Sequence, residues 1–312
     1  MLGRHGDNLF WLARYFERSE NNARRIRAVL YHALTREYRG EEEWAHMVHS
    51  MDASLLFEET YDEYDVSHVI DFLLRNRTYE NSVLSLVTKA RQNARSVRTA
   101  LTQDVWQALN ECWINCDSAL KRPIKIHDLP TILEHIIKGS SVFRGALYGT
   151  MLHNDIFNFL RLGTFIERAD NTARLINAKY HRLLPTAAVI GGGGDQGQWE
   201  VMLQSLAAWK SFNWLKKGRL DPTGVADFLI FDVRMPRSMA FCYREINVNL
   251  ADLSAAYGRA YISKEMSDDL CNRIDVGRTN KTHAVNLREF ISEYIALNNG
   301  LSLAIAEDFN MT

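Results

Sequence analysis

The sequence predicts an all-α fold, a helical bundle made of two tandemly duplicated multi-helix units. Three observations lead to this prediction. Apolar residues recur at helical spacing over long stretches, only five prolines occur in 312 residues, and the two halves of the chain share motifs in the same order. Alternation with a period of two, the pattern of half-buried strands, is almost absent. We therefore expect helices along nearly the whole chain.

The first predicted helix is amphipathic. Its apolar side is formed by Leu9, Leu12, Phe16, Ala23, Ile26 and Leu30. Similar spacing predicts helices over 66–99, 131–148 and 157–183. The glycine-rich stretch 185–198 predicts a flexible connector. Its glycines are not followed by Gly-Lys-Ser/Thr, so we expect no phosphate-binding loop there.

Internal similarity predicts the duplication. Residues 16–26 match residues 166–176 at an offset of 150. Two further blocks follow in the same order. They are Trp44, Met47 and Ser50 with Trp199, Met202 and Ser205, and 69–73 with 225–229. We expect one domain, 1–312, whose repeat units cover approximately 1–150 and 151–312 and pack around a pseudo-two-fold axis.

A second stripe runs along each repeated helix. It consists of Phe10, Ala13, Glu17, Asn21, Arg24 and Ala28, answered by Leu160, Gly163, Glu167, Asn171, Arg174 and Ala178. Small residues at matched positions allow another backbone or a ligand to approach closely. We expect the Glu, Asn and Arg side chains of both stripes to be largely withdrawn from solvent and joined by hydrogen bonds.

We consider three interpretations of the stripes. In the first, they form a buried network that fixes helix packing, because buried charges must be paired. In the second, they meet near the pseudo-dyad and line a binding pocket, where Arg24 and Arg174 hold an anion or Glu17 and Glu167 hold a cation. In the third, the same groups are catalytic.

Three arginines outside the stripes are further candidates for binding a ligand or a partner. Arg18 and Arg168 lie about 100° away from the stripe on the helical wheel. They are interpreted as flanking anion contacts or as exposed ends. Arg237 follows a proline and precedes Ser238, which is expected to cap the next helix. Arg237 then either reaches a cleft or is an exposed cap residue.

Composition argues against several function classes. With 37 basic and 38 acidic residues, the formal net charge is −1, so neither nucleic acid nor a membrane is an expected partner. No stretch reaches the roughly 18 apolar residues of a membrane span, and we expect a cytoplasmic protein. Four cysteines are too few for a disulfide framework, and Cys112 and Cys116 are interpreted as buried thiols. We expect no metal and no cofactor.

Several segments carry a resemblance to a known family. They are 1–4, 10–18, 106–110, 159–163, 166–170, 228–229 and 236–238. They resemble the bacterial alpha-E family, named for its helical content and its Glu-Arg motif, over essentially the whole chain. Two departures concern local packing: Ala13 stands where the family usually has glycine, and 154–156 replaces its usual Gly-Trp neighbourhood.

The resemblance implies partners rather than an established activity. The family that this chain resembles is usually encoded beside, or fused to, a circularly permuted ATP-grasp protein and a transglutaminase-like protein. This implies an accessory or substrate-binding component of a peptide ligation and modification system, with peptide as a possible ligand. Two alternatives remain: an enzyme of unassigned reaction that uses the duplicated Glu-Arg helices, and a regulatory helical interaction module.

Overall fold

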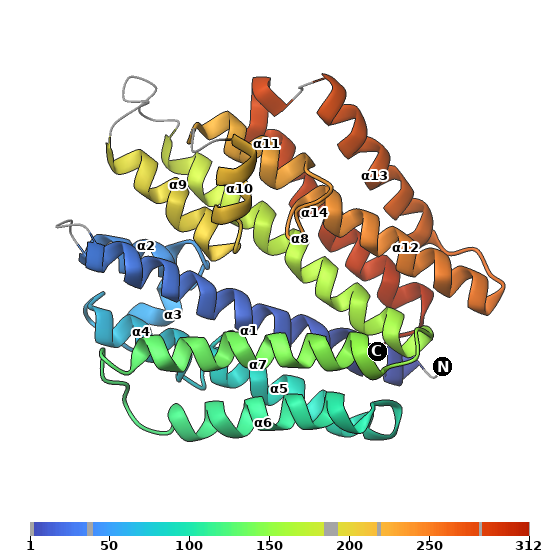
Figure 1. Ribbon diagram of the computed structural model, residues 1–312, viewed down its shortest axis with the longest axis horizontal. Helices are drawn as coiled ribbons and strands as arrows, with labels where there is room; N and C mark the ends of the chain where they lie inside the picture. Colours follow the sequence, from blue (N-terminus) through green and yellow to red (C-terminus); the bar gives the residue numbers. More distant parts are fainter. Residues whose placement is uncertain (1–2, 36–39, 184–192, 217–219, 281–282, 312) are drawn as a thin grey trace. The chain divides into compact units, whose positions relative to one another are not determined.

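The computed structural model describes residues 3–35, 40–183, 193–216, 220–280 and 283–311 (Figure 1). Within these ranges the chain forms fourteen α-helices and one short 3-10 helix, Arg98–Ala100, and it contains no strand. The all-α prediction is confirmed. Long, rarely interrupted apolar periodicity is sufficient for this result, because each amphipathic helix buries its apolar stripe against other helices.

The chain divides into two compact units. We call residues 15–151 the N-terminal unit, and residues 1–14 together with 152–312 the C-terminal unit. Helix α1 (Gly3–Thr35) contributes to both, because its residues up to Arg14 pack with the C-terminal unit. The compact units therefore differ from the predicted repeat halves mainly in these first residues.

The N-terminal unit holds the remainder of α1 and six further helices. These are α2 (Gly40–His49), α3 (Ser54–Glu58), α4 (Val66–Leu74), α5 (Val83–Ser96), α6 (Gln103–Ala119) and α7 (Leu129–Thr150). Helices α5, α6 and α7 pack in sequence, each against the next (Figure 1). Helix α1 closes the bundle: Phe16 meets Phe143 of α7 edge to face at 4.8 Å, and Tyr15 lies under Lys89 of α5.

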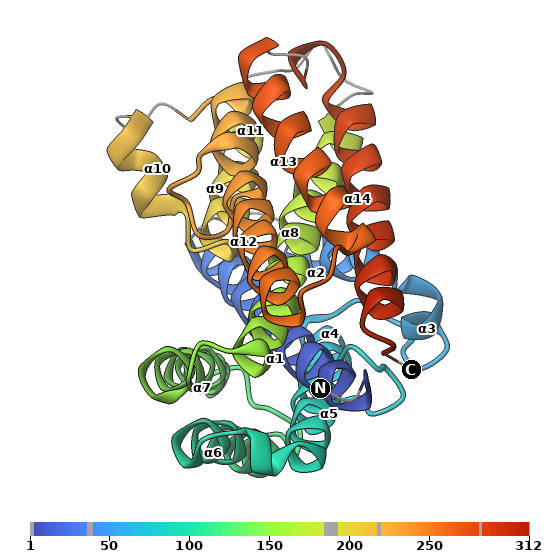
Figure 2. The ribbon, with the colours of Figure 1, turned by 90° about the vertical axis from the view of Figure 1, so that its right-hand side faces the viewer.

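The C-terminal unit contains the other seven helices. These are α8 (Asp155–Leu183), α9 (Gly193–Ser205), α10 (Trp209–Lys216), α11 (Pro222–Phe231), α12 (Met239–Tyr257), α13 (Ile262–Asn280) and α14 (His283–Asp308). Helix α8 packs on α12 and α14, and α13 packs on the same two helices (Figure 2). The four helices form a closed bundle, with α9, α10 and α11 beside it.

The two units use the same helix caps in the same order. Asp65 before α4 and Asp221 before α11 each accept a hydrogen bond from the amide three residues on, at 2.9 and 2.6 Å. Ser82 caps α5 and Ser238 caps α12 in the same way. The predicted Ser238 cap is confirmed. The duplication remains a prediction, which these parallel caps support, and the pseudo-two-fold axis remains a prediction as well.

The predicted connector, 185–198, is shorter than expected. Residues 184–192 lie outside the described residues, whereas α9 begins at Gly193. Glycine has poor helix propensity, but the following turns bury Trp199, Met202 and Leu203, and this tertiary packing outweighs the local preference. The last part of the predicted connector is therefore helix.

Gly163 of α8 allows the backbone of α1 to come very close. A Cβ atom added at Gly163 would lie 2.2 Å from the carbonyl oxygen of Phe10 and 3.1 Å from the Cβ of Ala13. The expectation that small residues of the stripe permit close approach is confirmed at this position. The close approach places the first turns of α1 directly against α8.

This contact predicts the sign of a stability change. Gly163→Ala should lower the free energy of unfolding by about 2 kcal/mol, because the new methyl group overpacks the contact. Elsewhere in a helix the same change gains up to about 1 kcal/mol. Gly145 of α7, with nothing within 4 Å of its added Cβ, is the control, and Gly145→Ala should stabilise. Denaturant unfolding measures both, and a Gly163→Ala protein as stable as wild type would contradict the close contact.

Candidate functional site

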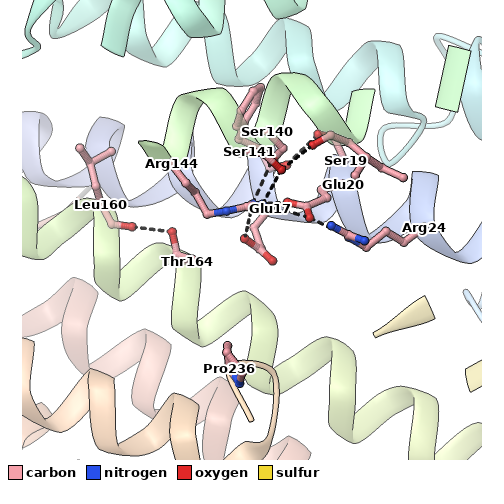
Figure 3. A network of polar contacts seen from close by, with 12 residues as sticks. Glu17, Ser19, Glu20, Arg24, Ser140, Ser141, Arg144, Leu160, Thr164 and Pro236 are labelled. Carbon is pink, nitrogen blue, oxygen red and sulfur yellow. Dashed lines mark hydrogen bonds and ion pairs between the residues drawn. The ribbon is translucent and has the colours of Figure 1, made fainter. Parts of the chain in front are cut away.

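In the N-terminal unit, the charged side chains of α1 form a network with α7 (Figure 3). Glu20 is 0% exposed, and its carboxylate accepts a hydrogen bond from the Nε of Arg24 at 2.7 Å. Arg144 of α7 donates to both oxygens of the same carboxylate. It also donates to the hydroxyls of Ser140 and Ser141, at 3.2 and 3.3 Å. The network joins two helices through a fully buried carboxylate.

Glu17 belongs to this network without pairing with Arg24. It is 3% exposed, and its Oε2 lies 3.7 Å from Nη1 of Arg144. The predicted Glu17, Asn21 and Arg24 stripe is correct about burial for the first two residues, since Asn21 is also buried. Arg24 is half-buried, and its partner is Glu20, one turn earlier on the helix.

Polar residues on another face of α1 bind the segment that precedes α5. Arg18 donates from Nη1 to the side-chain oxygen of Asn81 at 2.9 Å, and Asn22 donates to the Asn81 carbonyl at the same distance. Arg18 is half-buried, so its interpretation as an exposed end is wrong. It positions the start of α5.

In the C-terminal unit, Glu167 pairs with Arg14, a residue outside its own stripe. Glu167 is 3% exposed and accepts a hydrogen bond from the Nε of Arg14 at 3.1 Å. Arg14 also donates to the hydroxyl of Ser302 on α14 and lies 4.6 Å from the ring centroid of Trp11. This buried ion pair ties the beginning of α1 to α8 and α14.

Arg174 contradicts the prediction of a buried stripe. Its side chain is 51% exposed, and its Nε pairs with Asp170 at 2.7 Å. The pair of Arg24 and Glu20, at the matching positions of the sequence motif, has the same separation and distance, but the Arg24 side chain is only 12% exposed. The same sequence pattern therefore gives a buried pair in one place and a surface pair in the other. Asn171 is half-buried.

Arg168 and Arg237 are buried, at 8% and 5% exposure. The interpretations of Arg168 as an exposed end and of Arg237 as an exposed cap residue are therefore wrong. The Arg168 guanidinium lies 5.4 Å from the ring centroid of Phe165. The carbonyl of Arg237 accepts a hydrogen bond from the Thr172 hydroxyl at 2.7 Å, which fastens the start of α12 to α8.

A further arginine of α8, the half-buried Arg161, was missed by the sequence analysis. Arg161 donates to the carboxylate of Glu245 on α12 and lies between the rings of Phe157 and Phe165. Burial lowers the pKa of Arg161 to about 10, which still leaves the group charged at neutral pH, and burial raises the pKa of Glu245. The signal in the sequence is the flanking aromatic pair at a spacing of four residues on either side.

The residues that complete these networks were also missed, in two different ways. Glu20 and Asp170 could have been found, because each lies four residues before an arginine on a predicted helix. Arg144 and Arg14 carry no such local signal. Arg144 is 124 residues from Glu20, and Arg14 is 153 residues from Glu167.

No metal centre accompanies the networks in the part of the chain that the structure describes. No group of three or more His, Cys, Asp or Glu side chains suited to a metal ion occurs there. Cys112 and Cys116 are buried, as expected, and their mutual hydrogen bond, together with burial, raises the pKa of Cys116. None of the described helices combines the length and the apolar composition that a membrane crossing needs.

Comparison with known proteins gives a family and distant relatives. A model of the Alpha-E family, described as a predicted alpha-helical domain with a conserved ER motif, matches residues 1–309. Uncharacterized proteins of Mycobacterium bovis and Mycobacterium tuberculosis are 22% identical over 96% of this chain. The chain spans about a third of their length, 34%. No solved structure matches.

Proposed function

We propose that this chain, which belongs to the Alpha-E family, is an accessory or substrate-binding component of a peptide ligation and modification system. Its proposed partners are a circularly permuted ATP-grasp protein and a transglutaminase-like protein. One observation carries the proposal: the mycobacterial relatives hold about two thirds of their length outside the part that matches this chain. Joining modules in one chain raises their effective concentration, which is an advantage where they act together. The proposal includes a cytoplasmic location, where ATP is available.

The burial and pairing of Glu17 and Glu167 favour a binding component over an enzyme that uses the Glu-Arg helices. A catalytic carboxylate has to come within hydrogen-bond reach of its substrate. Glu17 and Glu167 are each 3% exposed, and each faces an arginine of a neighbouring helix. Buried, paired charges of this kind chiefly fix the packing of helices.

Helix α10 offers the contact surface for the proposed ATP-grasp partner. Trp214 is 88% exposed and its neighbour Leu215 is 43% exposed, although Phe212 on the same helix is fully buried. Tryptophan is strongly enriched among residues that dominate the free energy of protein association. Lys210 and Lys216 at the ends of α10 are exposed, so the surface fits an apolar patch with acidic groups at its rim.

The proposal is tested by measuring binding between the purified chain and the purified ATP-grasp protein. Trp214→Ala should weaken the complex by about thirtyfold, the effect of losing about 2 kcal/mol at a dominant contact residue. Its melting temperature should not change, because the side chain packs on little. Leu55→Ala is the control, since Leu55 is 82% exposed on α3 and lies outside the proposed surface. Equal binding by wild type and Trp214→Ala would refute this surface.

Calorimetry with ATP and magnesium separates the three alternatives. We expect the isolated chain to show no micromolar ATP binding, and peptide ligation by the partner to change when the chain is added. ATP turnover by the chain alone that is lost in Glu17→Gln would favour the enzyme. Complex formation without any effect on ligation would favour the regulatory module.

A further inference from the structure

Arg24 and Arg27 are two arginines of α1, and most of their N–H donors take no part in the network of α1 and α7. Arg24 donates through Nε to Glu20. Among the described residues, its two Nη groups have no hydrogen-bond partner, and Arg27 has neither a hydrogen bond nor an ion pair. Both residues are half-buried. Two partly desolvated guanidinium groups with free donors therefore lie three residues apart on one helix face.

The surroundings of Arg27 do not balance its charge by direct contact. Burial, and after it the charge of Arg24, lowers the pKa of Arg27. The hydroxyl of Tyr31 and the carboxylates of Glu134 and Glu20 act in the opposite direction, but only at a distance. An anion bound beside Arg27 would offset both the burial and the repulsion by Arg24.

The donors of the two arginines indicate an anion with paired oxygens. No carboxylate contacts Arg27 among the described residues, and Glu134 and Glu20 act on it only at a distance. A carboxylate group carries a single charge, and its two oxygens match the paired N–H groups of a guanidinium.

We propose that Arg24 and Arg27 bind a carboxylate group of an acidic peptide. The choice of a peptide rests on the proposed function, whereas the choice of a carboxylate rests on the N–H donors of the two half-buried arginines. Arg24 is a positioned donor, because its Nε is bound to Glu20, whose carboxylate Arg144 binds in turn. Arg27 supplies the second guanidinium. Its electrostatic environment changes more on binding than that of Arg24, because Arg24 is already paired with Glu20.

The C-terminal unit contains a matched control for this site. Arg174 is the repeat counterpart of Arg24 and makes the same 2.7 Å pair with the residue four positions before it. The counterpart of Arg27 is Asn177, so this position has no second guanidinium. If two neighbouring arginines are required, Arg174→Gln should leave carboxylate binding unchanged. Arg174 remains a candidate contact for a protein partner, since it is exposed.

The test is calorimetric titration of the isolated full chain with N-acetyl-tetraglutamate, with a tetraglutamine amide as the uncharged control. We expect binding of the first peptide, a loss of about tenfold or more in affinity in Arg27→Gln, and no loss in Arg174→Gln. Inorganic phosphate is titrated separately and should bind more weakly than tetraglutamate. Tighter binding of phosphate would overturn the assignment to a carboxylate.

A stability measurement supplies an independent readout. Arg27→Gln should raise the melting temperature of the protein without peptide, because it removes a half-buried cation next to Arg24. Tetraglutamate should then stabilise wild type more than it stabilises the variant. A less stable Arg27→Gln protein, equal peptide affinity in wild type and this variant, or an equal loss in Arg174→Gln would each overturn the proposal.

Experiment can refute the accessory role and the carboxylate site independently of each other. Peptide binding by the isolated chain, without any complex with the ATP-grasp protein, would refute the accessory role and leave the carboxylate site in place. Formation of the complex, with peptide affinity unaffected by Arg27→Gln, would refute the carboxylate site alone.

Discussion

Arg144→Met should lower the free energy of unfolding by about 3 kcal/mol, because it removes a cation from a fully buried carboxylate. Glu20 is 0% exposed and receives hydrogen bonds on both oxygens from Arg144. Methionine preserves most of the packed volume, so the loss reports on charge and hydrogen bonding rather than on a cavity. Denaturant unfolding followed by circular dichroism gives the value.

A double variant and a surface pair make this prediction specific. Adding Glu20→Gln removes the buried charge, so the two substitutions should couple by about 1 kcal/mol or more. The pair of Arg77 and Asp117 is the control, because these side chains are 70% and 40% exposed at 3.5 Å. Arg77→Met should change stability by less than about 0.5 kcal/mol. Similar losses in Arg144→Met and Arg77→Met would show that the network on α1 and α7 is open to solvent.

Glu167→Leu should be at least as costly, about 3 to 5 kcal/mol. The substitution takes the carboxylate from Arg14, whose side chain is 9% exposed, and leaves that guanidinium with the Ser302 hydroxyl and the Trp11 ring. A buried cation without a carboxylate is among the most destabilising single changes in a core. The measurement is again denaturant unfolding followed by circular dichroism.

Replacing both partners tests whether the loss comes from the unpaired charge. Arg14→Met combined with Glu167→Leu should recover part of the stability, since a buried ion pair replaced by apolar groups is often close to neutral. Glu293→Leu, at the surface pair with Arg273, should cost less than about 0.5 kcal/mol. A double variant as unstable as the sum of its single variants would argue against pairing as the cause.

Helix formation and capping in this protein are local and could be predicted from the sequence. Apolar spacing predicts α1 and α8, and a serine after a proline predicts the cap at Ser238. The acidic residue four positions before Arg24, and again before Arg174, predicts both helical ion pairs. These features depend only on residues within a turn or two of one another.

The burial of these residues cannot be predicted from the local sequence. Arg24 and Arg174 occupy matching positions in matching motifs, and both make a 2.7 Å pair, yet their side chains are 12% and 51% exposed. The difference comes from what packs on each helix: in the N-terminal unit, Arg144 of α7 reaches the carboxylate that holds Arg24. No pattern within α1 predicts which residue of a distant helix completes the network.

Spacing along the chain sets which side chains share a helix face, so the helical fold class, the caps and the i, i+4 pairs can be read from the sequence. Membership of the Alpha-E family also follows from the sequence. Packing between helices determines which charges are buried and which remain accessible. It gives Glu20 to Arg144 and Glu167 to Arg14, and it leaves Arg27 half-buried without a direct partner among the described residues. The physical reason is that the cost of burying a charge depends on the groups that neighbouring helices place around it.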